Sequence, residues 1–417
     1  MHKHRQSTFN HPPRWRAPIH PQTNNMMTAK LTALVSCALA AASARVPAPP
    51  PSLDDLWAGT ANFSPVRSLQ PGTAAFPSID AGTRVVARNG TFILFGRADN
   101  GTAVGACAQG TIAVNVRTSA DEGATWSAPA PVATPDLVSV CQYADGGAFF
   151  DDEAQRWHYL SQSYAPGGKG GWTLSHFSSA TPDPLGAWVA NAHNPVVRGG
   201  DLWSRICAGA GKHCLPGTVD EGTPDIVEKR GDEFIVTFHG YQYGARRAVR
   251  GVAATADFVT WRVDGAGLPG DAIFSSEDCA GWNVSWAPGG CIGSGESSSL
   301  RGPGGDIYQV IEAADVELTC DFTPGQQWWP LGLVRSPSWA PSPGWEQARA
   351  TPFMVGPHVG CSLAYNALWR DDVRGKTWWA VWNVDTVKGC SWWHIYALEW
   401  APAVLPMPGP QCSVPPA

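Results

Sequence analysis

One strand pattern recurs five times along the chain, turn residues are abundant, and no segment shows the period of an amphipathic helix. Together these observations predict an all-β protein, a five-bladed β-propeller of four-stranded antiparallel sheets. The composition fits this class, because 45 Gly and 36 Pro supply turns and 21 Trp supply large apolar side chains for packing between sheets. At 44% hydrophobic residues, the chain is too apolar for a disordered protein.

Each copy of the pattern opens on a polar or acidic residue, continues through two apolar strands joined by a turn, and closes near a tryptophan. The copies begin near residues 80, 145, 221, 296 and 361, at spacings of roughly 65 to 75 residues. The closing tryptophans are Trp126, Trp188, Trp261 and Trp345. We expect each of them to pack the outer hairpin of one blade. The alternative is one or two β-sandwiches in which the spacing is coincidental.

The N-terminal part of the chain is typical of a targeting segment. Lys30 precedes an apolar run, residues 31–44, that ends in the small-x-small pattern of a signal-peptide cleavage site. The run is too short to span a membrane, so we expect no membrane span. A polar stretch precedes it, and either Met26 or Met27 could be the true start of translation.

These features divide the chain into three parts. Residues 1–44 are an N-terminal extension with a secretory signal peptide, and residues 45–75 form a proline-rich lead-in. Residues 76–417 form a single propeller domain. The mature protein is therefore expected to be secreted and extracellular.

Cysteine usage supports secretion. Cys37 lies in the apolar run, and the other ten of the 11 cysteines form an even set that an oxidising compartment would pair. Short loops favour the pairs Cys207–Cys214 and Cys279–Cys291, although the connectivity does not follow from sequence. No cysteine or histidine spacing indicates a zinc site, so no metal ligands are assigned. Glycosylation sequons occur at Asn62, Asn89, Asn100 and Asn283.

The charge of the chain bears on its partners. A net charge of −6 provides no electrostatic attraction for nucleic acid, so we expect no nucleic-acid partner. We expect the protein to be a monomer.

The segment SADEGATW, residues 119–126, places Ser119, Asp121, Gly123, Thr125 and Trp126 within eight positions. Asp and Gly favour a turn in which the acid binds nearby backbone amides, whereas Thr and Trp favour strands. The segment therefore predicts a hairpin corner in which Asp121 accepts hydrogen bonds from the turn and Trp126 packs against a sheet. It resembles the Asp-box of sialidases and related propellers, a structural motif.

The openings of the repeats resemble the five-bladed propeller glycosidases, the group of arabinanases, xylosidases and fructosidases. The segments that carry this resemblance are DGGAFFDDEAQRWHYLSQ from residue 145, DEGTPDIVEKRGDEFIVTF from residue 220 and ATADFVTW from residue 254. It covers most of the chain beyond residue 75. The sequence departs from the group after Asp80, where Ala81 and Gly82 replace a proline, and at EGTP in place of EGP.

The resemblance implies a secreted glycoside hydrolase whose substrate is an oligo- or polysaccharide. In that group the first three blades each present an acid to the central channel, as general base, as orienting acid and as general acid. This implies those roles for Asp80, Asp145 and Glu221, respectively. Glycoside hydrolysis needs one protonated and one ionised carboxyl group on either side of the bond, and crowding of carboxylates raises the pKa of one of them.

Four further residues are candidates for substrate binding. Glu296 opens the fourth repeat and could line the channel, or act as the acid if the blade register differs. Trp203 lies in a cysteine-containing loop that could rise between blades and stack on a sugar. His239 and Arg246 could contact sugar hydroxyls. No cofactor is required, and the resemblance implies a structural calcium ion in the central channel as an option.

Two alternatives to a five-bladed propeller glycosidase remain. A non-catalytic extracellular propeller that binds glycans or proteins would use the same strands and the same Asp-box, because a fold does not imply a function. A sialidase-like enzyme would use Arg84, Arg97 and a third arginine to hold a substrate carboxylate, but the spacing shows no arginine triad.

Overall fold

The computed structural model describes twelve stretches of the chain. They are residues 48–69, 81–168, 171–210, 218–242, 247–265, 268–269, 293–319, 327–328, 331–339, 345–348, 363–385 and 390–400. The chain divides into two compact units, residues 1–49 and residues 50–417, and the second contains every element described below.

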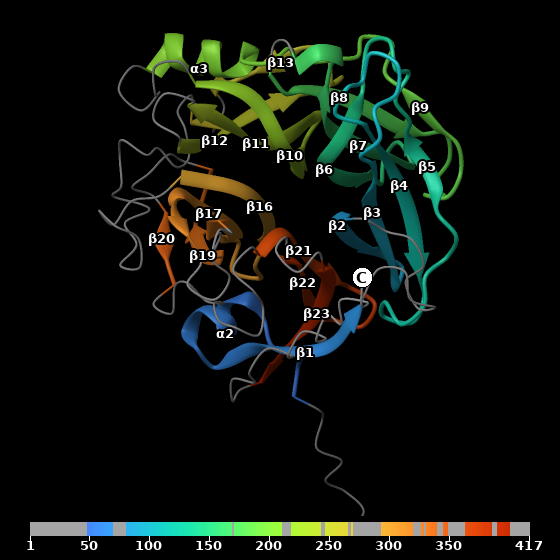
Figure 1. The fold of residues 1–417 in the computed structure, drawn as a ribbon. Coiled ribbons are helices and arrows are strands. Elements are labelled where there is room, and N and C mark those ends of the chain that lie inside the picture. The colour runs from blue at the N-terminus through green and yellow to red at the C-terminus, as the bar shows by residue number, and fades with distance from the viewer. Residues whose placement is uncertain are drawn as a thin grey trace, which may run out of the picture. The chain divides into compact units, whose positions relative to one another are not determined.

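Most strands form five antiparallel groups, which we call the first to fifth blades (Figure 1). One parallel pair, Ile112 opposite Gln142, joins the first two blades into a single eight-stranded sheet. The first blade consists of β2 (Ala81–Arg88), β3 (Thr91–Asn100), β4 (Thr111–Ser119) and β5 (Ala130–Ala133). The second consists of β6 (Gln142–Asp151), β7 (Arg156–Tyr164), β8 (Thr173–Ser179) and β9 (Trp188–Ala190). The third consists of β10 (Thr218–Arg230), β11 (Glu233–Gln242), β12 (Arg247–Thr255) and β13 (Trp261–Arg262). The fourth consists of β16 (Gly293–Arg301), β17 (Ile307–Thr319), β19 (Leu331–Ser336) and β20 (Glu346–Gln347), and the short β18 (Gln327–Trp328) also pairs with β17. The fifth consists of β21 (Leu363–Asp371), β22 (Lys376–Asp385), β23 (Cys390–Trp400) and β1 (Ala61–Leu69).

The remaining elements are short. They are the helices α2 (Leu53–Ala58) and α3 (Asp201–Ala210), the 3₁₀ turn Pro166–Gly168, and a small hairpin of β14 (Asp264–Gly265) and β15 (Leu268–Pro269). Within the described stretches, no helix is long and apolar enough to cross a membrane.

The innermost strands of the five blades close into a ring. In order, β2 contacts β6, β6 contacts β10, β10 contacts β16, β16 contacts β21, and β21 returns to β2. Figure 1 shows the sheets arranged around this common centre. The predicted five-bladed propeller of four-stranded sheets is confirmed.

The fifth blade is completed by the N-terminal strand. β1 pairs antiparallel with β23, from Ala61 opposite Trp400 to Leu69 opposite Trp393. Residues 61–69 lie within the lead-in expected for residues 45–75, so the blades include residues that precede the domain boundary expected at residue 76. Because the two ends of the described chain lie in one sheet, backbone hydrogen bonds between β1 and β23 close the ring of blades.

The outer corner of the first blade is held by local hydrogen bonds. In the first blade the Asp121 carboxylate accepts the backbone N–H of Thr125 at 2.8 Å and its hydroxyl at 2.6 Å. The Ser119 hydroxyl accepts the Gly123 N–H, and the Trp126 indole donates to the Gly123 carbonyl at 3.1 Å. The hairpin corner predicted for residues 119–126 is present with these contacts.

A second corner of this kind occurs in the third blade. There the Asp257 carboxylate accepts the backbone N–H and the hydroxyl of Thr260, and the Thr255 hydroxyl accepts the Phe258 N–H. Trp261 follows and is buried. This corner is one residue shorter than the corner of the first blade, so its sequence does not have the Asp-box spacing. Its hydrogen bonds nevertheless join the same kinds of groups as those of the first corner.

The core lies between neighbouring blades. Trp378 packs against Phe92 of the first blade with ring centroids 5.1 Å apart, whereas the next residue, Trp379, belongs to a buried cluster with Tyr308 of the fourth blade. Adjacent strand residues point to opposite faces of a sheet, so this pair fills the interfaces on both sides of the fifth blade.

Candidate functional site

All five innermost strands carry an irregularity near the same end. Each loses its pairing register and regains it within a few residues, which is the signature of a β-bulge. The residues directly before pairing resumes are Thr83, Asp145, Glu221, Glu296 and Tyr365. Bulges turn side chains away from the regular alternation and are frequent beside active sites. Three consecutive blades therefore place an acid at the equivalent strand position.

Asp145 is buried at this bulge and has partners from two other strands. Its Oδ1 lies 3.5 Å from Arg97 Nη1 on β3, and its Oδ2 accepts an N–H from Gln162 Nε2 on β7 at 2.9 Å. Arg97 also lies 3.2 Å from Asp99. Burial raises the pKa of the Asp145 carboxyl to about 6, and the Arg97 charge opposes this rise.

Gln162 connects Asp145 to the third blade. Its side-chain oxygen accepts the backbone N–H of Thr223 at 2.9 Å, so its amide nitrogen must face Asp145. The Thr223 hydroxyl lies 2.6 Å from Nδ1 of His239, one of the predicted substrate ligands. A Cβ on Gly222 would lie 2.3 Å from Cε1 of His239, so only glycine fits there. His239 is partly buried in this network, and burial lowers its pKa to about 3, which keeps the imidazole neutral.

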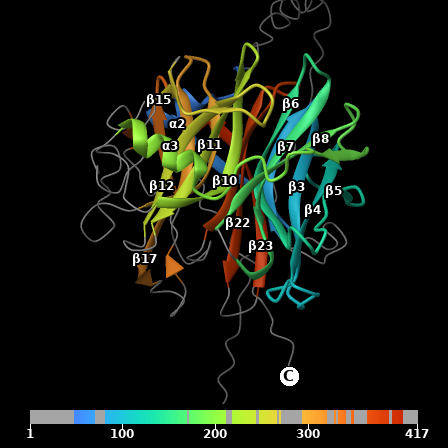
Figure 2. The ribbon, with the colours of Figure 1, turned by 90° about the horizontal axis from the view of Figure 1, so that it is seen from above.

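Glu221 faces the beginning of α3. Its carboxylate accepts the backbone N–H groups of Gly200, Leu202 and Trp203, the last two at 3.0 and 3.3 Å. A carboxylate is favourable at a helix N-terminus, where backbone N–H groups lack partners. The side chain is fully buried, and burial raises its pKa to about 8, against the effect of the three N–H donors. Figures 1 and 2 show α3 beside the third blade.

Trp203 lies in the interior of the protein. It belongs to α3, has no exposed surface, and packs against Phe238 with ring centroids 5.4 Å apart. Its loop position had suggested sugar stacking, but a buried indole offers no face to a sugar.

The other predicted site residues are only partly within the described stretches. Asp80 directly precedes β2, and Arg246 directly precedes β12; both lie outside the described residues. Glu296 lies in β16 at the bulge, and only its backbone is described.

An aromatic pair that sequence reasoning missed lies near the acids. Tyr164 ends β7 and Trp172 precedes β8, and their ring centroids are 4.9 Å apart. Both side chains are partly exposed. The backbone carbonyl of Trp172 accepts the N–H of Glu221, and the backbone N–H of Trp172 donates to the Asp220 carboxylate. The signal in the sequence was a tryptophan in the glycine-rich loop before a strand, where binding residues are common.

The centre of the ring holds an ion pair. Arg84 on β2 and Asp225 on β10 approach to 3.1 Å, with both side chains 5% exposed. Arg84 also donates to the Ser298 hydroxyl on β16 at 2.6 Å, and that hydroxyl accepts the N–H of Leu368 on β21 at 2.8 Å. A Cβ on Gly147 of β6 would lie 2.8 Å from Asp225 Oδ1. All five blades therefore meet at this pair.

This arrangement does not fit a calcium ion at the same level of the channel. Calcium takes six to eight oxygen ligands, and carboxylates are its main source of negative charge. Here the guanidinium of Arg84 already neutralises Asp225 and would repel a second cation. Within the described residues, no group of three His, Cys, Asp or Glu side chains could hold a metal ion.

The two arginines of the sialidase alternative also have partners. Arg84 is bound to Asp225, and Arg97 lies against Asp99 and Asp145. Both therefore neutralise carboxylates of the protein itself.

One disulfide joins the first two blades, from Cys107 to Cys141, which directly precedes β6. Cys207 is also disulfide-bonded. Cys214, Cys279 and Cys291, of the two pairs expected from short loops, lie outside the described residues.

Comparison with solved structures shows the same fold in glycoside hydrolases. The protein BT0996, solved in a complex with RGII, has a TM-score of 0.56 and 13% identity, over 85% of the present sequence and 98% of its own. A thermostable family-43 glycoside hydrolase has a TM-score of 0.52 and 10% identity, over 81% and 95% of the two proteins. A glycosyl hydrolase from Bacteroides ovatus has a TM-score of 0.51 and 15% identity, over 84% and 97%. No protein-family model and no curated protein matches the sequence.

These comparisons confirm, at the level of the fold, the resemblance to propeller glycosidases.

Proposed function

We propose that the protein is a secreted glycoside hydrolase that cleaves an oligo- or polysaccharide with paired carboxyl groups in the central funnel of the propeller. The single observation that carries the proposal is the equivalence of Asp145, Glu221 and Glu296. They occupy the same bulge position on three consecutive inner strands. The backbone positions of the three acids therefore lie at the same end of their inner strands, and in the proposal carboxyl groups from different blades act on one glycosidic bond there.

The contacts of the described residues support distinct tasks for these groups. Asp145 is held by Arg97 and Gln162, so its direction is fixed and it suits the role of an orienting acid. Asp80, one residue before β2, is the proposed base that activates water. The proton donor is a glutamate, Glu221 or its bulge equivalent Glu296. The pKa of Glu221, raised by burial, keeps a proton on this group near neutral pH.

The aromatic pair supplies a surface for the substrate. Tyr164 and Trp172 are partly exposed beside the residues that bear the acids, and aromatic rings present an apolar face with a polar edge. In the proposal a sugar residue stacks on this pair while its glycosidic bond lies over the channel.

Secretion is part of the proposal. The apolar run of residues 31–44 supports it, and so does the disulfide between Cys107 and Cys141, because such bonds persist in oxidising compartments.

One observation favours a second function, a non-catalytic propeller that binds glycans. Glu221 caps α3 and is fully buried, so in this arrangement its carboxyl group cannot reach a substrate. A binding module would need the aromatic pair and the funnel, but no accessible proton donor.

The experiment is hydrolysis of a broad panel of aryl glycosides and plant or algal polysaccharides by the mature protein, Glu221→Gln and Glu296→Gln. Loss of activity in only one variant identifies that glutamate as the proton donor. Retention of full activity in both variants would contradict the proposed machinery. Glycan-array binding by a wild-type protein that hydrolyses nothing would instead establish the second function.

A further inference from the structure

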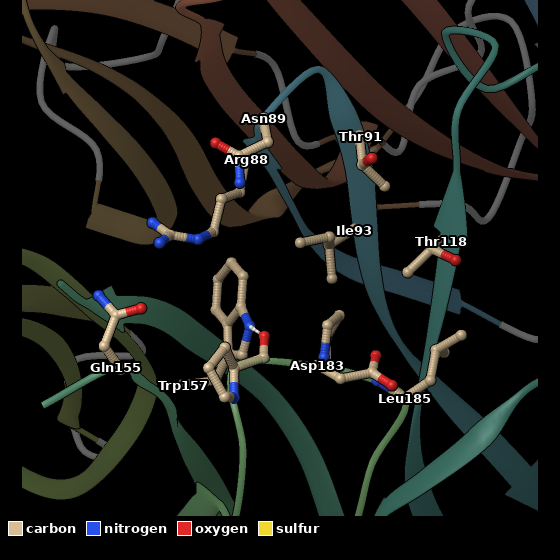
Figure 3. A pocket seen from close by; sticks show the side chains of 11 residues that line it. Arg88, Asn89, Thr91, Ile93, Thr118, Gln155, Trp157, Asp183 and Leu185 are labelled. Carbon is tan, nitrogen blue, oxygen red and sulfur yellow. Dashed lines mark hydrogen bonds between the residues drawn. The ribbon is translucent and has the colours of Figure 1, made fainter.

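A groove lies between the first and second blades, at the end of the strands opposite the bulges. Its volume is about 480 Å³. Figure 3 shows the side chains of Ile93, Trp157 and Leu185 at its apolar floor and side, with polar groups around them. The indole of Trp157 donates to the Pro182 carbonyl at 2.9 Å, which fixes the floor. Ligand sites of this size are mostly apolar with a few placed polar groups.

The groove is bordered by a glycosylation sequon. Asn89, Gly90 and Thr91 form the tripeptide Asn-Gly-Thr, and both Asn89 and Thr91 line the groove. Asn89 is exposed at the tip of the two-residue turn between β2 and β3, with φ of 50°. Arg374 of the fifth blade donates to the Gly90 carbonyl at 2.7 Å, so the turn is held in place from its other side.

We propose that Asn89 carries an N-linked glycan and that the first sugars of this glycan lie in the adjoining groove. This inference rests on the proposed secretory route and is independent of the proposed hydrolysis. Attachment forms a bond from Asn89 Nδ2 to the anomeric carbon of an oligosaccharide carried on a lipid pyrophosphate. The anomeric bond to the pyrophosphate breaks, the amide loses a proton, and the lipid pyrophosphate leaves.

Physical chemistry favours this occupant. A pyranose has an apolar C–H face that suits the apolar floor, and hydroxyls that can bond to the Arg88, Gln155 and Asp183 side chains at the edge. A covalent tether raises the effective concentration of the sugar at the groove to about the millimolar range, so a weak contact is enough to order it.

The chain contains a matched control. Asn100, Gly101 and Thr102 form the same tripeptide at the other end of β3, and Asn100 is exposed. The two sequons are separated by the length of β3, roughly 30 Å at about 3.3 Å per residue. Asn100 does not line the groove.

The test is expression of the full chain in a eukaryotic secretory host behind an added leader, so that residues 31–44 are not themselves under test. Glycopeptide mass spectrometry gives the occupancy of Asn89 and Asn100. Release of each glycan by peptide N-glycosidase is then timed on native and on denatured protein. We expect both sites to be occupied, with release from Asn89 at least tenfold slower than from Asn100 in the native protein and equal rates after denaturation.

Two groove variants sharpen the test. Leu185→Ser removes apolar floor and Gln155→Ala removes a polar edge, and each should bring the native release rate at Asn89 towards that at Asn100. An Asn89 site without glycan overturns the proposal, whether or not Asn100 is occupied. Equal native release rates at the two sites in the wild-type protein overturn the role of the groove.

Discussion

Arg84 and Asp225 form a buried ion pair, 3.1 Å apart, that joins the innermost strands of the first and third blades. Through Ser298 the same arginine reaches the fourth blade and, by the N–H of Leu368, the fifth. Removing one partner of a buried pair leaves a charge without compensation, whereas replacing both by apolar residues is often tolerated.

We therefore expect Asp225→Asn to lower the free energy of unfolding by about 3–5 kcal/mol. Arg84→Met combined with Asp225→Leu should cost less than Asp225→Asn alone. The matched control is Arg370→Gln, which removes an exposed pair with Asp372 and should cost less than about 1 kcal/mol. Urea unfolding measures all three, and equal losses for Asp225→Asn and Arg370→Gln would contradict the central role of the pair.

The second prediction concerns metal removal. Because Arg84 supplies the positive charge beside Asp225, no calcium ion is needed at this level of the channel. A calcium chelator should leave the melting temperature of the mature protein unchanged, as thermal scans with and without added calcium would show. A fall in melting temperature that calcium restores would place a structural ion in the protein.

The third prediction concerns pH and Asp145. Burial raises the folded-state pKa of this carboxyl to about 6, whereas the unfolded chain ionises it near 4. Between these values the unfolded state binds fewer protons, so stability falls as pH rises. Relative to Asp145→Asn, the wild-type protein should lose about 3 kcal/mol of stability between about pH 4 and pH 6. Urea unfolding across this range tests it, with the exposed Asp232→Asn as control; a constant difference would refute the assignment.

The fourth prediction has the opposite sign. His158 and His176 are buried between the second and third blades, 3.0 Å apart, and burial lowers their pKa values to about 4 and about 3. Below the ordinary histidine pKa the unfolded state binds protons that the folded state excludes, so stability falls as pH drops from about 6.5 to about 4. His176→Gln should reduce this loss, and the exposed His193→Gln should not. Identical acid profiles for the two variants would disprove the explanation.

The sequence predicted those features of the fold that depend on residues close together in the chain. The repeat indicated the blade number, and the corner at Asp121 followed from turn and strand preferences. The register of the inner strands also placed Asp145 and Glu221 at equivalent positions, as the repeat openings had suggested.

Contacts between distant segments could not be predicted. The pairing of β1 with β23 joins residues more than 300 positions apart, and nothing in residues 61–69 specifies that partner. Nor does the sequence near Glu221 indicate that α3 would begin against its carboxylate. Arg84 and Asp225 meet only because the ring closes, and a single sequence contains no signal for that meeting.

The proposed role of the bulge acids is tested most sharply by hydrolysis of the glycoside and polysaccharide panel by the wild-type protein and Asp145→Asn. Asp152→Asn is the control, because Asp152 is an exposed acid in the turn after the same strand and pairs with Arg88. We predict cleavage by the wild-type protein and the control, and a loss of at least about a hundredfold in Asp145→Asn, the scale expected when reacting groups lose their orientation. Full activity in Asp145→Asn, or no cleavage by the wild-type protein on any substrate, would contradict the proposed function.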